Sequence, residues 1–322
     1  MSEPGRRAQD TPEGPVSSRS ARSVTRGLAL SCHPLPTLAV TGLAAGLAGA
    51  AGAPPRRTGL LAAAVLSGQL AIGWANDTLD AGRDAARGRA DKPVATGEAP
   101  RPLVAAAAVV AAAATVPLSL RLGRVAGTAQ LGLVASGLAY DLGLKRTALS
   151  ALPYLTGFGA LPVAAHRTAG AGPVPLALPL AGAVLGCGAH LLNALPDLAD
   201  DAATGVRSLP VRLGPDRTRR GGALLLAVAA ALPQQGPRSP AGSAARVAAG
   251  GLALAAAGRF PDGPGGRPSR RPFAYAVASA AADLALLLAR SRAARTGRQA
   301  GERGRSVRLP DLPTDRHRSP AS

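Results

Sequence analysis

The chain has 322 residues, is rich in Ala and Gly, and carries a formal net charge of +19 with a mean hydropathy of +0.15. Such a charge is common among nucleic-acid-binding proteins, but only 2% of the residues are aromatic, so the chain lacks the interleaved stacking side chains that hold single strands. We therefore expect no nucleic-acid partner. Two cysteines, Cys32 and Cys187, exclude a disulfide framework.

The order of polar and apolar segments predicts one membrane domain between two polar tails. Residues 1–25 are rich in Ser, Arg, Pro and Gly, and residues 291–322 are rich in Arg, so both are predicted to be disordered. Residues 26–290 contain long uncharged runs, several of which reach the roughly 18–20 residues that a helix needs to cross a bilayer. Because backbone groups in lipid must be paired within helices, we predict an all-α polytopic membrane protein with about nine spans. The predicted spans are centred on residues 35–52, 59–75, 103–120, 125–140, 149–165, 174–193, 220–235, 244–258 and 272–289.

The distribution of Arg and Lys predicts the orientation of these spans. If the amino terminus is cytoplasmic, the loops near 76–102, 141–148, 197–220 and 259–271 fall on the same side, and they carry most of the basic residues between the tails. An excess of basic residues marks cytoplasmic loops. We therefore expect an integral protein of a bacterial cell membrane with these loops in the cytoplasm.

The first acidic motif follows the second predicted span. Asn76, Asp80 and Asp84 are spaced by four residues, and Asp77 lies beside them. A helix places residues with this spacing on one stripe. Carboxylates gathered at a membrane surface repel one another, and a divalent cation relieves that repulsion. The motif therefore predicts a cation site.

A second acidic motif follows the sixth predicted span and repeats this spacing. Asn193, Asp197 and Asp201 are again four residues apart, with Asp200 beside them. Two such stripes facing each other would form a carboxylate-lined cup, which suits Mg²⁺ and, through it, a polyphosphate. Solvated acidic loops are the alternative, but matching motifs at matching positions favour the cup. The predicted metal ligands are Asp77, Asp80, Asp84, Asp197, Asp200 and Asp201.

Basic residues surround the same loops. Arg89 and Lys92 follow the first motif and Arg207 follows the second, and we expect these three to bind diphosphate oxygens. The other arginines are interpreted as cytoplasmic surface charge, and His33 as an interfacial residue near a span end. Tyr140 and Lys145 lie in the loop after the fourth span, where their types alone indicate an interface anchor.

Taken together, these motifs resemble those of the UbiA-type intramembrane prenyltransferases. That family shows N-D-x-x-D-x-x-x-D after its second helix, which is complete here as Asn76–Asp84. Its R-x-x-R-P-L-x-x-G continuation is similar to Arg89–Gly97. Its second motif and the G-x-R-T-L-x-x-x-L-G that follows are similar to Asn193–Gly214. Its conserved Tyr…Lys loop resembles Tyr140–Lys145.

The resemblance covers roughly residues 28–290, and it implies a fold and an activity. The fold would be nine transmembrane helices around a central cavity, capped on the cytoplasmic side by the two motif loops. Two Mg²⁺ ions would join the Asp side chains to a prenyl diphosphate. The prenyl group would pass to a small acceptor, as in quinone-type biosynthesis, within the lipid bilayer.

The resemblance also implies roles for individual residues. Asp80, Asp197, Tyr140 and Lys145 would be catalytic. Asn76 and Asn193 would join the three basic residues named above in holding the diphosphate. Lys92 stands where the family's pattern has Arg.

The second motif departs from the family pattern, and two alternative functions remain open. Ala194 stands where many members have an Asp, and Pro196 cannot donate a backbone hydrogen bond. The second motif is therefore predicted to lie at or just past the end of its span. A terpene cyclase of the same fold would need no acceptor. A membrane transporter or lipid carrier would release no diphosphate, but its charges would lie in mid-membrane rather than at span ends.

Overall fold

The computed structural model describes residues 21–232 and, beyond them, residues 248, 250, 251, 255, 258, 269, 271–275, 277, 278 and 280. The described part of the chain is helical and contains no strand, which confirms the all-α prediction. Its elements are α1 (Ala21–Ser31), α2 (Pro34–Ala50), α3 (Pro55–Ala86), α4 (Arg101–Leu120), α5 (Arg124–Leu142), the 3-10 helix η1 (Leu144–Arg146), α6 (Leu152–Thr168), α7 (Ala177–Ala194), the 3-10 helix η2 (Leu195–Asp197), α8 (Leu198–Ala203) and α9 (Leu209–Ala231).

Seven of the predicted spans coincide with helices α2, α3, α4, α5, α6, α7 and α9. The predicted spans near 244–258 and 272–289 fall largely outside the described residues, as do the two polar tails. Helix α1 begins at Ala21, inside the segment 1–25 that the sequence analysis assigned to a polar tail. Its side chain Leu28 packs against a buried cluster with Ala99 and Val104, which gives this short polar segment an apolar surface to fold on.

Several helices have the length and composition of membrane spans. Within the described ranges, Pro55–Ala86, Arg101–Leu120 and Ala177–Ala203 meet both requirements, and α1 with α2 would count as one further span, bent by 54°. The exposed side chains agree with this. Val109 and Val110 of α4 are 69% and 68% exposed, which is unfavourable in water and favourable against lipid. The protein is therefore a multi-pass membrane protein.

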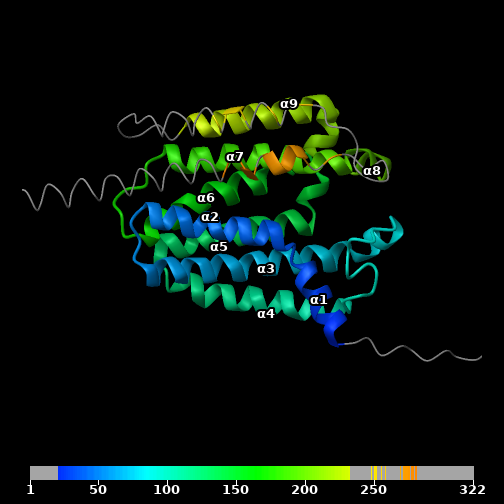
Figure 1. The fold of residues 1–322 in the computed structure, drawn as a ribbon, viewed down its shortest axis with the longest axis horizontal. Helices are drawn as coiled ribbons and strands as arrows, with labels where there is room; N and C mark the ends of the chain where they lie inside the picture. The colour runs from blue at the N-terminus through cyan, green and yellow to red at the C-terminus, as the bar shows by residue number, and fades with distance from the viewer. Residues whose placement is uncertain are drawn as a thin grey trace, which may run out of the picture.

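The helices lie roughly side by side along one direction, with α4 at one edge and α9 at the other (Figure 1). Helix α3 packs on α2, α4 and α5, and the sequence of contacts continues through α6 and α7 to α9. Small residues allow close approach: Gly182 and Gly186 of α7 lie against the carbonyls of Phe158 and Tyr154 on α6, where any side chain would collide.

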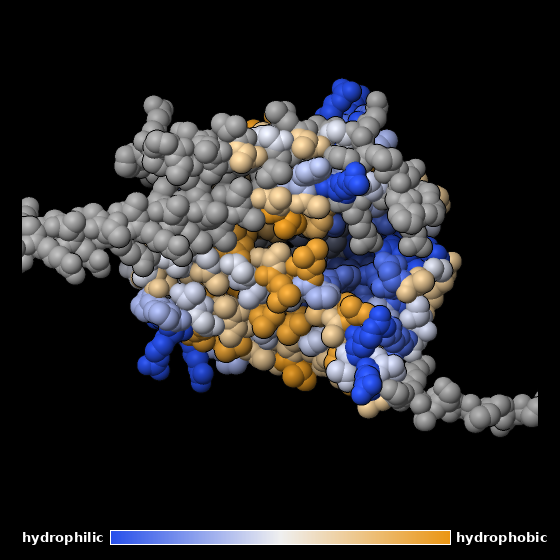
Figure 2. Space-filling model, viewed as in Figure 1, coloured by the Kyte–Doolittle hydropathy of each residue, from blue (hydrophilic) through white to orange (hydrophobic). Residues whose placement is uncertain are grey.

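The surface divides into an apolar band and a polar end. Hydrophobic residues cross the middle of the face shown in Figure 2, and hydrophilic residues gather at the right-hand end. That end carries α8 and the carboxyl end of α3, which are the elements that hold the two acidic motifs. Both motifs therefore lie at the same end of the bundle.

Candidate active site

The first acidic motif lies in the last turns of α3. This helix has 32 residues, which exceeds the length needed to cross a bilayer, so its final turns extend past the apolar band. It ends at Ala86, and Gly88 follows with φ of 62°, a left-handed conformation that glycine adopts without strain. Asp77, Asp80 and Asp84 are all buried, at 1%, 5% and 4% exposure. Asp80 and Asp84 of the predicted stripe, together with Asp77, therefore face the protein interior, while Asn76 is partly buried.

The second acidic motif is divided among three elements. Helix α7 ends at Ala194, η2 contains Pro196 and Asp197, and α8 carries Asp201. The predicted position at the end of the span is confirmed, and Pro196 provides the reason, since it has no N–H for a continuing α-helix. The second stripe is therefore not one regular helical face. Asn193 is exposed at the end of α7, and Asp197 lies half-buried after it.

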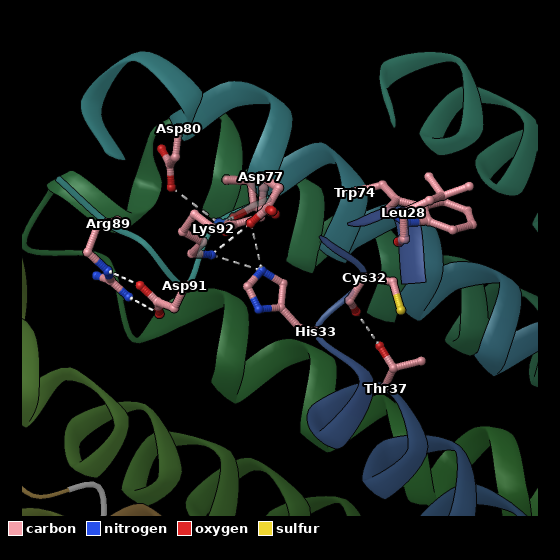
Figure 3. A network of polar contacts seen from close by, with 12 residues as sticks. Leu28, Cys32, His33, Thr37, Trp74, Asp77, Asp80, Arg89, Asp91 and Lys92 are labelled. Atoms are coloured by element: carbon pink, nitrogen blue, oxygen red, sulfur yellow. Dashed lines mark hydrogen bonds and ion pairs between the residues drawn. The ribbon is translucent and has the colours of Figure 1, made fainter. Parts of the chain in front are cut away.

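Asp77 is held by two side chains from outside α3 (Figure 3). Lys92 Nζ donates to Asp77 Oδ1 at 2.8 Å, and His33 Nε2 lies 3.3 Å from the same oxygen. Lys92 Nζ also contacts His33 Nε2 at 3.2 Å. The prediction for His33 missed this position, because nothing in the spacing of the sequence connects it to a residue on α3.

Asp80 belongs to a ring of four side chains. Lys145 Nζ donates to Asp80 Oδ2 at 2.6 Å and lies 3.5 Å from Asp141 Oδ1. Asn76 Nδ2 donates to Asp141 Oδ1 at 2.7 Å and to Asp80 Oδ2 at 3.4 Å. Arg83 adds a further ion pair to Asp80 at 2.9 Å. The Tyr140–Lys145 loop thus contributes a buried carboxylate, Asp141, that the sequence analysis did not assign to the site.

Two arginines connect the loop after α3 to the second motif. Arg89 lies 3.3 Å from Asp197, and Arg87 lies 3.3 Å from Asp201. Asp91 accepts two hydrogen bonds from Arg89, at 2.9 and 3.0 Å, and this pairing raises the pKa of the Arg89 guanidinium above its usual range. Arg89 is therefore a permanent cation between the two acidic motifs.

Two predicted residues lie apart from these contacts. The side chain of Arg207 is exposed and makes no ion pair with any residue that the structure describes, although its backbone N–H donates to the carbonyl of Arg146 at 3.1 Å. Asp200 is exposed as well, and its backbone carbonyl, rather than its carboxylate, accepts from Arg87 at 3.1 Å.

An aromatic cluster lies behind the second motif. The rings of Tyr140 and Tyr154 meet edge to face at 5.2 Å, His190 lies 4.7 Å from Tyr154, and Phe158 stacks on Tyr154 at 6.1 Å. These rings come from α5, α6 and α7, so their proximity depends on helix packing and was not predicted. Tyr140 is the one predicted site residue among them.

A basic cavity opens between the motifs. Its volume is about 390 Å³. Arg83 lines the cavity and also pairs with Asp80, so the cavity lies close to that carboxylate. Arg146 lines it with a second guanidinium, which is exposed. Guanidinium groups bind phosphate oxygens in a bidentate manner, so the wall suits an anionic group. The lining residues are Arg83, Arg146, Thr204, Gly205 and Val206.

The acidic residues have the chemistry of a Mg²⁺ site, and four of them, Asp77, Asp80, Asp197 and Asp201, are paired with basic side chains. Within the described ranges, no three His, Cys, Asp or Glu side chains are gathered closely enough to hold a metal. Asp77 Oδ2 and Asp141 Oδ2 are nevertheless buried without a hydrogen-bond partner there, which is unusual for such atoms. Oxygen donors of this kind are the ligands Mg²⁺ prefers. The chemistry of these donors therefore fits Mg²⁺.

Comparison with known proteins places this geometry in a family. The UbiA prenyltransferase family model matches residues 36–297. A UbiA homologue from Archaeoglobus fulgidus bound to GPP and Mg²⁺ has a TM-score of 0.60 at 16% identity, covering 81% of this chain and 99% of that chain. A structure bound to DMAPP and Mg²⁺, from the same organism, has a TM-score of 0.61 at 18% identity, with coverage of 81% and 99%.

The apo structure of a UbiA homologue from Aeropyrum pernix K1 gives a TM-score of 0.60 at 17% identity, covering 81% of this chain and 98% of that chain. No curated protein matches the chain. At these identities the solved structures show a common fold. The family match covers far more than half of the chain and includes both acidic motifs, so this protein belongs to the UbiA prenyltransferase family.

Proposed function

We propose that this protein transfers a prenyl group from a prenyl diphosphate to a small acceptor within the membrane, with two Mg²⁺ ions bound between the acidic motifs. The observation that carries the proposal is the joining of the motifs: Arg89 pairs with Asp197 and Arg87 with Asp201, although more than 100 residues separate each pair. Family membership supports the reaction class, and the solved homologues bound to GPP or DMAPP with Mg²⁺ support the ligands.

The metal would be held by the motif carboxylates. Bound Mg²⁺ would neutralise the diphosphate and act as a Lewis acid toward the leaving group. The buried oxygens Asp77 Oδ2 and Asp141 Oδ2 support ligation at the first motif. The proposed ligands are Asp77, Asp80, Asp84, Asp197, Asp200 and Asp201.

The basic side chains would hold the diphosphate. Arg89 and Lys92 lie against motif carboxylates, at 3.3 Å from Asp197 and 2.8 Å from Asp77, so either could exchange its carboxylate partner for a phosphate oxygen. Lys145, which lies beside Asp80, would contact the same diphosphate. Arg207 would take part only if its exposed side chain turned toward the motifs.

Asn76 and Asn193 would also help to hold the diphosphate. Because the Asp141 carboxylate only accepts, the amide nitrogen of Asn76 faces it, and Asn76 Oδ1 is left for a metal or a hydroxyl. Asn193 lies at the end of α7, three residues after His190 of the aromatic cluster. Those ring faces, including Tyr140, would stabilise positive charge that develops on the prenyl group, and they favour an aromatic acceptor.

The orientation in the membrane is part of the proposal. The motifs lie at the end of the bundle that carries Arg83, Arg87, Arg89 and Lys92. Basic residues at one end mark the cytoplasmic side, so substrates would enter from the cytoplasmic face of a bacterial cell membrane.

The test is turnover by purified protein in vesicles. Geranyl diphosphate with Mg²⁺ and a panel of phenolic and lipid acceptors should give a prenylated product and diphosphate, identified by mass spectrometry. Asp80→Asn and Asp197→Asn should each abolish transfer while thermal unfolding stays cooperative. Asp216→Asn is the matched control, because Asp216 pairs with Arg219 on α9, outside both motifs.

Other outcomes of the same assay identify the alternatives. A cyclised product formed from geranyl diphosphate without any acceptor would show a terpene cyclase. Uptake of a lipid with no release of diphosphate would show a carrier. Unchanged transfer by both motif variants would show that the metal assignment is wrong.

A further inference from the structure

His33 forms an unusual junction between α1 and α2. The two helices are bent by 54° at this point, and His33 has φ of 53° and ψ of 68°. It is the only non-glycine residue with a positive φ in the part of the chain that the structure describes. A β-carbon makes this left-handed conformation unfavourable, although His and Asn adopt it more readily than most residues.

Neighbouring residues hold this junction in place (Figure 3). Trp74 Nε1 on α3 donates to the carbonyl of Leu28 at 2.9 Å, and Thr37 Oγ1 on α2 donates to the carbonyl of Cys32 at 2.7 Å. Gly73 lies against the same Cys32 carbonyl so closely that a β-carbon there would collide with it. The surrounding structure therefore imposes the left-handed conformation on His33.

The junction points the imidazole at the first acidic motif. His33 Nε2 lies 3.2 Å from Lys92 Nζ and 3.3 Å from Asp77 Oδ1, while Lys92 donates to that same oxygen at 2.8 Å. An ammonium group can only donate, so in the neutral Nδ1–H tautomer His33 Nε2 accepts from Lys92. Lys92 thus has two acceptors, and one of them is a proposed metal ligand.

The left-handed backbone at this junction does not require a histidine side chain. Glycine fits a left-handed junction with no strain, and Asn fits it about as well as His. Strained residues of this kind cluster at active sites, where the surrounding structure maintains them. A strained His that touches both a proposed diphosphate-binding Lys and a proposed metal ligand is therefore placed for function.

We propose that His33 is a positioning residue for Lys92. When Asp77 is engaged by metal, His33 Nε2 remains as the acceptor that keeps the Lys92 ammonium over the acidic motif, with its other N–H groups directed at a diphosphate oxygen. The ligand class is a prenyl diphosphate, so this inference rests on the proposed function. The bend between α1 and α2 places the imidazole beside Lys92 and Asp77.

The test uses substitutions that tolerate the left-handed backbone. In His33→Gly and His33→Asn the junction keeps its conformation, so the thermal unfolding midpoint should stay within about 2–4 °C of wild type. The loss of one hydrogen bond to a charged group should lower kcat/KM for geranyl diphosphate about tenfold, with most of the change in KM. Imidazole added to His33→Gly should restore activity, since the His33 side chain is 35% exposed. A purely structural role would give no such rescue.

A double substitution tests whether His33 acts through Lys92. In a Lys92→Met background, His33→Gly should cause no further loss, because the group that it positions is absent. His166→Asn is the matched control: His166 lies on α6, outside the acidic motifs, and its substitution should leave kcat/KM unchanged. Wild-type kcat/KM in His33→Gly, lack of imidazole rescue, or an equal loss in the Lys92→Met background would each overturn the proposal.

A binding measurement separates this inference from the proposed function. Calorimetry with Mg²⁺ and inorganic pyrophosphate requires no turnover, and His33→Gly should bind the pair about tenfold more weakly than wild type. If wild-type protein transfers no prenyl group but this weakening is observed, the proposed function fails and the role of His33 stands. If wild-type protein is active and pyrophosphate binding is equal in both, the role of His33 fails.

Discussion

Asn76 on α3 donates its side-chain amide to Asp141 at the end of α5, with a distance of 2.7 Å between Nδ2 and Oδ1. This contact joins the first acidic motif to the loop that carries Lys145. It fixes the orientation of the amide, because a carboxylate cannot donate. Asp141 is a buried acid, 6% exposed, that does not belong to either acidic motif. It lies beside the first motif because it accepts from both Asn76 and Lys145.

Replacing Asp141 should impair turnover more than folding. In Asp141→Asn the carboxamide can still accept from Asn76, but Lys145 loses one of its two counter-charges and keeps only Asp80, so kcat should fall about tenfold. Asp141→Ala should lower it further by freeing the Asn76 amide. Steady-state kinetics on Asp141→Ala, Asn76→Ala and the double variant would check this. Additive losses would show that the two residues act independently.

Removing Lys145 should destabilise the protein in a way that metal corrects. Its side chain is 8% exposed between Asp80 and Asp141, so Lys145→Met leaves the buried Asp141 without its cation and Asp80 with Arg83 alone. Breaking a buried ion pair from one side costs about 3–5 kcal/mol. Thermal unfolding in detergent should show this loss, and millimolar Mg²⁺ should recover part of it. A midpoint that Mg²⁺ does not raise would contradict cation binding at Asp80.

Arg89 should act as a charge that does not depend on pH. The hydrogen bonds that Arg89 donates to Asp91 raise the pKa of the guanidinium, which is already far above the working range. A raised pKa favours the cation, and its contribution would be lost only above the folded-state pKa. Arg89→Gln should therefore raise KM for geranyl diphosphate about tenfold, by the same factor at every pH between about 6 and 9. Arg89→Lys should rescue only part of the loss, because Lys lacks the bidentate geometry. A factor that changes with pH would mean that another group controls the effect.

The contact between α6 and α7 should not tolerate a larger residue. Gly186 lies against the Tyr154 carbonyl and the Phe158 ring, so Gly186→Val must separate the two helices. Overpacking of this kind costs about 1–3 kcal/mol, and here it would also displace the aromatic cluster. Gly132→Val on α5 is the control, since a β-carbon at Gly132 meets nothing within 4 Å. Thermal unfolding and turnover should both decline in the first variant, and neither should decline appreciably in the second.

Much of the site was accessible from local sequence. Asn76, Asp77, Asp80 and Asp84 lie within nine consecutive positions, and helical periodicity alone places three of them on one stripe. Pro196 predicted the end of α7 for the same kind of reason, because the missing N–H acts on its own helix. The seven matching spans follow from uncharged runs of bilayer length. In each case the decisive interaction joins residues that are close in the chain.

The partners of these residues depended on tertiary structure. His33 lies 44 positions before Asp77, and Asp141 lies 65 positions after Asn76, so no periodicity links either pair. Their meeting requires the bend at the α1–α2 junction and the packing of α5 on α3. Hydropathy and helical periodicity act locally, so the amino-acid sequence was enough to predict which helices form and which oxygen donors they carry. The cation that faces each carboxylate depends on how rigid helices pack against one another, so it became clear only from the folded structure.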